Sequence, residues 1–116
     1  MTKPINRSNY YELQLKLFRK LIEGNIEIEI KGATIPYTSF NGHMFAYLEK
    51  DGSFGLRLPQ HVLDEFLEKY NTTLFKSYGI IKKEFALVPN ELFNKTEELL
   101  PYFRISFEYV KSLKPK

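Results

Sequence analysis

Residues 34–59 read TIPYTSFNGHMFAYLEKDGSFGLRLP and decide the fold that we expect. This segment contains two turn signals, Asn41-Gly42 and Asp51-Gly52, each placed between short runs rich in apolar and aromatic residues. Asn-Gly and Asp-Gly pairs favour the tight turn that joins two antiparallel strands. The segment therefore predicts a meander of three strands, over residues 34–40, 43–49 and 54–58. Pro36 confines the first of them to a sheet edge or an irregular stretch, because proline has no backbone N–H to donate.

A helix and a further strand are predicted before this meander. Asn9 and Glu12 form a capping-box pattern at the start of the helix, and Gly24 can take the left-handed conformation that ends it. Isoleucine then alternates with a charged residue over residues 25–31, which predicts a strand with one buried face. Residues 1–8 are mostly polar and are expected to form a flexible tail.

The second half of the chain predicts another helix and a hairpin. Pro59 ends the meander, and a stripe of apolar residues at helical spacing follows it: Val62, Leu63, Phe66, Leu67 and Tyr70. Two short strands, over residues 73–77 and 84–88, are predicted on either side of the turn signal Tyr78-Gly79.

A last helix is expected after this hairpin. Asn90 and Asn94 are its candidate N-caps, and Pro101 is expected in its first turn, where proline costs no hydrogen bond. The predicted order is α-β(3–4)-α-β(2)-α over a single domain of residues 9–116. This order indicates an α+β fold of two layers, in which helices cover one face of an antiparallel sheet.

Composition restricts the possible functions. The chain has 116 residues, which is the size of one domain, and it has no cysteine, which excludes disulfides, thiolate ligands and a cysteine nucleophile. No segment resembles a signal peptide or reaches the roughly 18 apolar residues of a membrane span, so we expect a cytoplasmic protein without a membrane partner. The net charge of +3 is spread evenly over both halves of the sequence. We therefore do not expect direct nucleic-acid binding, which usually uses a clustered basic face.

Catalytic and metal-binding patterns are weak in this sequence. The only histidines are His43 and His61, and neither has the converging ligands that a metal site needs, so no metal or cofactor is expected. Ser39 and His43 lie across the Asn41-Gly42 turn and could meet on facing strands, but no Gly-x-Ser-x-Gly motif accompanies them.

A segment rich in hydroxyl groups is the best candidate for a binding surface. Tyrosine beside small hydroxyl residues is typical of adaptable contact surfaces. The candidate surface consists of Thr34, Tyr37, Thr38, Ser39, His43 and Arg57. Because residues 34–40 are also expected to form a weakly protected sheet edge, we expect a weak homodimer through this surface or the adjoining aromatic face.

Several short motifs are similar to those of one known family. They are the hairpin segment NGHMFA at residues 41–46, Arg57-Leu58-Pro59, Tyr78-Gly79, Lys83-Glu84, Val88-Pro89 and the closing SLKPK at residues 112–116. This succession resembles the family built on the N-terminal domain of TfoX/Sxy, a regulator of bacterial competence genes, over about residues 9–116. Where many members of that family have Met-Phe-Gly before the hairpin, this chain has Gly32-Ala33-Thr34.

The resemblance implies a fold similar to that of type III secretion chaperones, a regulatory association and no known catalytic residue. We therefore expect a small non-enzymatic regulatory or adaptor domain of bacterial type that acts through protein–protein contacts. The alternative is a small-molecule-binding protein or an enzyme that uses a polar cleft near Ser39, His43 and Arg57. A deep concave site with converging polar groups would distinguish the alternative.

Overall fold

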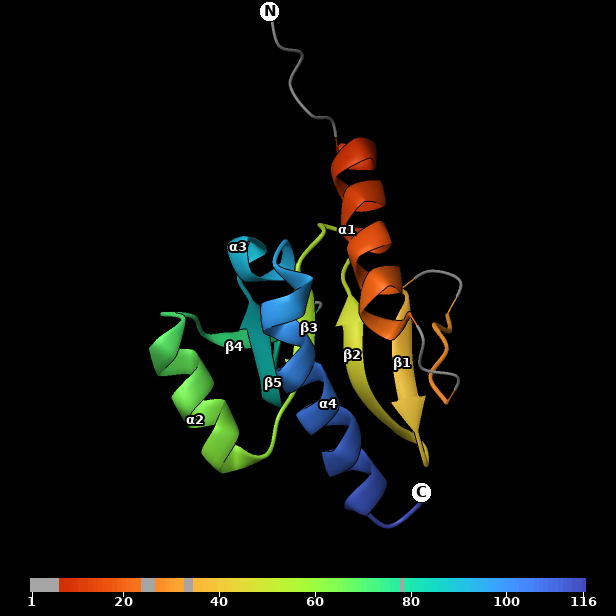
Figure 1. The fold of residues 1–116 in the computed structure, drawn as a ribbon, viewed down its shortest axis with the longest axis vertical. Helices are drawn as coiled ribbons and strands as arrows, with labels where there is room; N and C mark the ends of the chain where they lie inside the picture. Colours follow the sequence, from red (N-terminus) through yellow and green to blue (C-terminus); the bar gives the residue numbers. More distant parts are fainter. Residues whose placement is uncertain (1–6, 24–26, 33–34, 78) are drawn as a thin grey trace, which may run out of the picture.

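A computed structural model describes residues 7–23, 27–32, 35–77 and 79–116 of the chain. In this part of the chain the fold is α+β, with a five-stranded antiparallel sheet and four helices (Figure 1). The elements in chain order are α1 (Arg7–Ile22), β1 (Tyr37–Phe40), β2 (His43–Leu48), β3 (Phe54–Arg57), α2 (Gln60–Lys69), β4 (Leu74–Ser77), β5 (Ile80–Val88), α3 (Asn90–Phe93) and α4 (Thr96–Ser112).

The sheet has the strand order β1-β2-β3-β5-β4. The three-stranded meander is confirmed, because β1 pairs with β2 and β2 pairs with β3, both antiparallel. Asn41 and Gly42 join the first two strands with φ values of 54° and 82°, the positive values that the predicted turn requires. β1 and β4 are the edge strands, and β1 follows Pro36 as expected for an edge.

The main core lies between the helices and one face of the sheet. All four helices contribute buried residues to it, and in Figure 1 α1 and α4 cross in front of the strands. Phe54 on β3 stacks on Phe93 of α3 at 4.4 Å between ring centres and meets Phe18 of α1 edge-on at 4.9 Å. Such ring pairs add to the stability that burial of their large apolar area provides.

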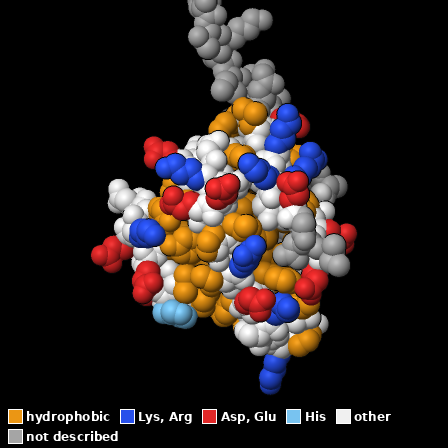
Figure 2. All heavy atoms as spheres, viewed as in Figure 1, with side chains coloured by type: hydrophobic (Ala, Val, Ile, Leu, Met, Phe, Trp, Pro, Cys, Tyr) orange, Lys and Arg blue, Asp and Glu red, His pale blue; other side chains and the backbone are white. Residues whose placement is uncertain are grey.

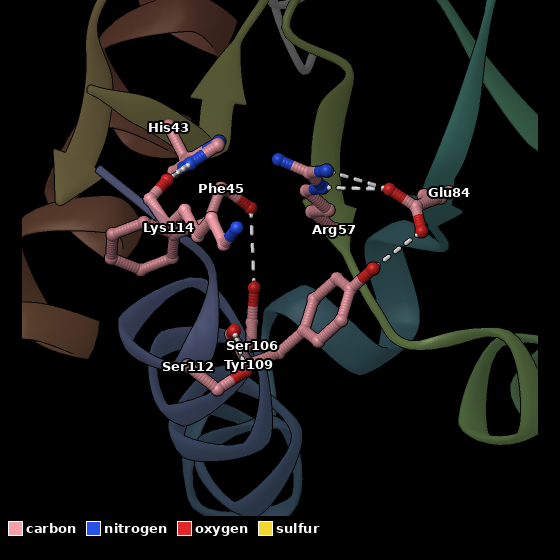
Figure 3. A network of polar contacts seen from close by, with 8 residues as sticks. All are labelled: His43, Phe45, Arg57, Glu84, Ser106, Tyr109, Ser112 and Lys114. Carbon is pink, nitrogen blue, oxygen red and sulfur yellow. Dashed lines mark hydrogen bonds and ion pairs between the residues drawn. The ribbon is translucent and has the colours of Figure 1, made fainter. Parts of the chain in front are cut away.

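A bulge in β2 lets this strand present two consecutive side chains to the helices. Thr38 pairs with Ala46 and Ser39 pairs with Met44, so Phe45 is an extra residue in the ladder. Phe45 and Ala46 consequently both belong to the main core. The carbonyl oxygen of Phe45 accepts a hydrogen bond at 3.4 Å from the buried hydroxyl of Ser106 on α4, drawn in Figure 3.

A second, smaller core lies on the other face of the sheet. It is formed by Tyr47, Phe75 and Phe85, with the Tyr47 ring 4.9 Å from Phe75 and 5.3 Å from Phe85. Phe75 of the edge strand β4 lies directly over Gly55 of β3, where a Cβ atom would come within 2.6 Å of its ring. β4 therefore folds back over the sheet instead of only extending its edge.

A buried polar contact fixes this folded-back position. The hydroxyl of Ser77, at the end of β4, donates a hydrogen bond of 2.5 Å to the carboxylate of Glu49 in the β2–β3 connection. Both residues are buried, although β3 and β5 separate β2 from β4 in the sheet order. Because a buried carboxylate is costly without hydrogen-bond donors, this contact favours one position of β4.

The predicted strand over residues 25–31 is wrong for the part of it that is described. Residues 28–30 form no strand, and only Lys31 makes an isolated bridge, to Tyr37. The alternation nevertheless predicted correctly which side chains are buried. Ile28 is buried and Ile30 packs on the core, while Glu27 and Glu29 are exposed. Ile26 and Gly24 lie outside the described residues.

The boundaries of several helices differ from the prediction. α1 begins at Arg7, so Asn9 lies inside the helix instead of capping it, and only the first six residues of the predicted tail stay outside the described part. Helix ends depend on the last hydrogen-bonded turn, which local sequence signals locate only within a few residues.

The C-terminal region contains two helices where one was predicted. α3 begins at Asn90, after Pro89, and Asn94 ends this helix instead of starting the next one. Pro101 lies inside α4 and not in its first turn. The Pro101 side chain is exposed to solvent, so the proline ring does not disturb the packed face of the helix.

We expect Gly55→Ala to destabilise the fold by about 1–3 kcal/mol, because the added methyl group would overlap the ring of Phe75. Alanine normally improves on glycine in a strand, so the sign of the effect depends on this contact. Urea unfolding measures the change. Phe75→Leu makes room for the methyl group, and it should therefore cost less in the Gly55→Ala background than in the wild type. Additive costs would contradict the packing of β4 over Gly55.

Candidate functional site

A network of three side chains joins β3, β5 and α4 on one side of the molecule. The guanidinium of Arg57 donates two hydrogen bonds to one carboxylate oxygen of Glu84, at 3.0 Å from Nε and 2.7 Å from Nη2. The hydroxyl of Tyr109 donates to the other oxygen at 2.6 Å. Figure 3 shows Arg57 and Tyr109 approaching Glu84 from different elements. We call these three residues the Arg57–Glu84–Tyr109 network.

The backbone of β5 is distorted at Glu84, the residue that this strand contributes to the network. The pairing passes from Leu74–Ala86 to Lys76–Ile81, so two steps along β4 match five along β5. Within this bulge Glu84 has φ = 71°, in the left-handed region that costs a residue with a side chain about 1 kcal/mol or more. The hydrogen bonds to Arg57 and Tyr109 offset that cost. Strained residues of this kind are often found at functional sites.

The network also balances its own charge. Burial raises the pKa of Glu84, but the hydrogen bonds from Tyr109 and Arg57 and the charge of Arg57 outweigh burial, so the pKa lies below its ordinary value. The hydrogen bond to Glu84, together with burial, raises the pKa of the Tyr109 hydroxyl. Glu84 is thus an ionised, paired carboxylate at neutral pH, and Tyr109 keeps its proton.

An aromatic surface continues from this network along α4 and α2. Tyr102, Ile105 and Tyr109 are three and four residues apart on α4 and share one face of the helix. Tyr70, at the end of α2, lies 5.9 Å from Tyr102 between ring centres, and its hydroxyl donates to Glu98 at 3.0 Å. Burial, with added effects from Tyr102 and Glu98, raises the pKa of Tyr70. We call Tyr70, Tyr102, Ile105 and Tyr109 the aromatic stripe.

The aromatic stripe remains accessible to solvent. Ile105 is 37% exposed, while the three tyrosines are half-buried. Figure 2 shows hydrophobic side chains gathered over α2 and α4 in the middle and lower left of this face. Arg57 also contacts the stripe, with its guanidinium carbon 5.5 Å from the centre of the Tyr109 ring.

The three residues predicted to line a polar cleft do not share a partner in the described part of the chain. Arg57 pairs with Glu84, and the Nε2 of His43 donates a hydrogen bond of 2.7 Å to the carbonyl oxygen of Lys114. Ser39 is 3.5 Å from the ammonium group of Lys31. Ser39 pairs with Met44 instead of His43, because the two-residue turn at Asn41-Gly42 pairs His43 with Phe40.

A surface pocket of about 510 Å³ lies beside Ser39. Its lining combines the end of β1 and the turn after it with residues of the segment before β1: Glu27, Ile28, Glu29, Lys31, Ser39, Phe40, Asn41 and Gly42. His43 and Arg57 do not line it. The pocket therefore does not combine the residues that the cleft hypothesis requires.

The other residues of the predicted binding surface have different environments. Thr38 is fully buried in the sheet and so cannot belong to a surface, because alternation along β1 turns it to the interior. Tyr37 is half-buried against the second core, and its backbone pairs with that of Lys31 at 2.7 and 2.9 Å. Thr34 lies outside the described residues.

No group of three or more potential metal-ligating side chains occurs in the described ranges of the chain. No helix within those ranges is long and apolar enough to cross a membrane. Comparison of the chain with protein-family models, curated proteins and solved structures found no match.

Sequence reasoning missed Glu84 and Tyr109. They are 25 residues apart in sequence and meet only through the fold. The single local signal was a charged run, Lys82-Lys83-Glu84, within a segment of strand-forming residues. Such a run does not identify the partner of the carboxylate.

We expect the contribution of Glu84 to stability to depend on pH. The pKa of Glu84 is lower in the folded protein than its ordinary value of 4.5, so the ionised form stabilises the fold above that pH and the gain is lost as pH falls through the folded-state pKa. At neutral pH, Glu84→Gln should lower the free energy of unfolding by about 1 kcal/mol. In urea titrations this difference should shrink below pH 4.5.

Glu108→Gln is the matched control for this experiment. Its carboxylate is 71% exposed and lies 3.9 Å from Lys111, so its removal should change stability little at any pH. A difference for Glu84→Gln that stays constant with pH would contradict the ionised pair.

Proposed function

We propose that this protein is a non-enzymatic regulatory or adaptor domain that acts through protein–protein contacts. The observation that carries the proposal is the aromatic stripe with Arg57 beside it. Tyrosine and arginine are enriched at the centres of protein interfaces, where their large side chains supply contact area and a polar end. An exposed isoleucine between two tyrosines has no evident role in the stability of the isolated chain.

The proposal is favoured over the small-molecule or enzymatic alternative by the separation of Ser39, His43 and Arg57. General acid–base or nucleophilic catalysis needs such groups within hydrogen-bond reach of one reacting atom. Each of the three instead contacts a different group of the protein. Arg57 has its charge compensated by Glu84, which leaves it less suited to bind a free anion.

The finer features of the proposal come from the resemblance to TfoX/Sxy N-terminal domains. They are a two-layer arrangement similar to that of type III secretion chaperones, a regulatory role and a cytoplasmic location. The α+β fold and the three-stranded meander support this part of the proposal. The even distribution of charge supports the absence of direct nucleic-acid binding.

We expect Ile105→Glu to abolish recovery of the protein partner. Affinity capture from a lysate of the native host, followed by mass spectrometry, should recover a protein with the wild type and roughly tenfold less of it with the variant, because a charge at the centre of an interface is costly. Leu13→Glu is the matched control, since Leu13 is 48% exposed on α1 and lies outside the stripe.

Two outcomes would contradict the proposed function. One is equal loss of the partner with both variants, which would show that the stripe is not the contact. The other is a reproducible activity in a panel of hydrolase substrates that His43→Ala or Ser39→Ala abolishes, since this would support the enzymatic alternative.

We also propose that the protein forms a weak homodimer through the segment at residues 34–40. β1 is an edge strand, and exposed edges tend to pair. In the described part of the chain, the backbone of Lys31 pairs with that of Tyr37 at the outer edge of β1, and it pairs with no other residue of this strand. A two-fold arrangement would bring two such edges together.

Sedimentation equilibrium at tens of micromolar protein should reveal the dimer as a rise in mean mass with concentration. Ser39→Glu should abolish this rise, because two like charges would face each other across the paired edges. Thr73→Glu, an equivalent change beside the opposite edge strand β4, should leave it unchanged. A monomer mass throughout the range would contradict the dimer.

A further inference from the structure

The free end of the β4–β5 hairpin exposes two consecutive isoleucines. Ile80 is 62% exposed and Ile81 is 53% exposed, the highest values among the large apolar side chains in the described residues. Gly79, which precedes them, has φ = 75°, and a Cβ atom on it would meet no atom within 4 Å. Ile80 and Ile81 therefore give the end of the hairpin an apolar surface that is open to solvent, although Ser77 opposite Ile80 is buried against Glu49. We call Gly79, Ile80 and Ile81 the hairpin tip.

Three lysines lie beside the hairpin tip. Lys76 pairs with Ile81 across the hairpin, and Lys82 and Lys83 follow directly in β5. Residues 69–83 contain no Asp or Glu. None of the three lysines forms an ion pair with a carboxylate in the part of the chain that is described.

The carboxylate that follows these lysines is already paired. Glu84 accepts hydrogen bonds from Arg57 on β3 and from Tyr109 on α4. Both carboxylate oxygens of Glu84 are thus engaged by Arg57 and Tyr109, although Glu84 and Asp64 line one surface pocket together with Lys83. The hairpin end keeps a local positive charge although the whole chain has a net charge of only +3.

These features together restrict what can cover the hairpin tip. A second copy of the tip in a two-fold dimer would bring six lysines together, which like-charge repulsion disfavours. Nucleic acid would pair with the lysines but would leave the isoleucines in water. A protein partner would need an apolar pocket with an acidic rim to match both the isoleucines and the lysines. An anionic bilayer meets both requirements without a preformed pocket.

We propose that the hairpin tip docks on the surface of a bilayer that contains anionic lipids. Ile80 and Ile81 enter the boundary between headgroups and acyl chains, and Lys76, Lys82 and Lys83 lie at the level of the lipid phosphates. Each lysine near such a surface strengthens binding by about fivefold. The contact is peripheral, so it requires no membrane-spanning segment. It goes beyond the proposed function and departs from the sequence-based expectation of no membrane partner, which considered only membrane spans.

Sedimentation with sucrose-loaded vesicles tests the proposal. We expect the wild type to pellet with vesicles of equal parts phosphatidylcholine and phosphatidylglycerol, and to stay in solution with vesicles of phosphatidylcholine alone. Binding should weaken as salt concentration rises, because salt screens the lysines. Absence of binding to the mixed vesicles at low salt would overturn the proposal. It would do so even if the hairpin tip were found to bind a protein.

Variants separate the apolar contribution from the basic one. Ile80→Ser with Ile81→Ser should lower affinity for mixed vesicles by at least about tenfold, because the serines bury no apolar area. Lys82→Gln with Lys83→Gln should lower it by about 25-fold, from two lysines of about fivefold each. Leu13→Ser is the matched control, with an apolar side chain that is 48% exposed on α1, and it should bind as the wild type does.

Two results with these variants would overturn the proposal. One is unchanged binding by the double isoleucine variant, which would mean that charge alone attracts the protein. The other is equal loss by Leu13→Ser, which would mean that any exposed apolar side chain has the same effect. All four substituted side chains of the hairpin lie outside the main core, so we expect every variant to fold. Circular dichroism of each variant checks this expectation.

Discussion

The contact of Phe75 with Gly55 is the constraint on which much of this structure depends. Only a residue without a side chain at position 55 allows the ring to lie against the backbone of β3. That contact lets the edge strand β4 fold over the second face of the sheet and brings Ser77 to the buried carboxylate of Glu49. The small second core therefore exists because the large side chain of Phe75 lies over a residue without a side chain, Gly55, on a strand that is not its neighbour in the sheet.

The same folding of the hairpin explains the distortion of β5. One end of this strand pairs regularly with β3, whereas the other end follows β4. The bulge at Glu84 accommodates the difference between these two pairings. The left-handed backbone at Glu84 turns the carboxylate of this residue toward Arg57 and Tyr109. Two ends of one strand with different partners thus create the polar network that joins β3, β5 and α4.

The two surfaces assigned to binding differ in chemistry. The aromatic stripe is formed by half-buried rings whose hydroxyls engage carboxylates, as Tyr109 does with Glu84 and Tyr70 with Glu98. Such a surface supplies area and directional hydrogen bonds, which a folded protein partner can match. The hairpin tip has aliphatic side chains, with three lysines beside it that form no ion pair in the described residues, and this combination suits a fluid anionic surface. Together, the two proposals describe a domain that holds a protein partner close to a membrane surface.

The sequence by itself determined the elements whose cause is local. The turn at Asn41-Gly42 and the apolar stripe of α2 follow from residues within a few positions of one another, so both were predicted. The alternating isoleucines before Lys31 predicted burial correctly but not a strand, because a strand also needs a partner for its backbone. The bulges, the second core and the Arg57–Glu84–Tyr109 network were decided only by the tertiary structure, since each depends on a contact between distant segments that no periodicity records.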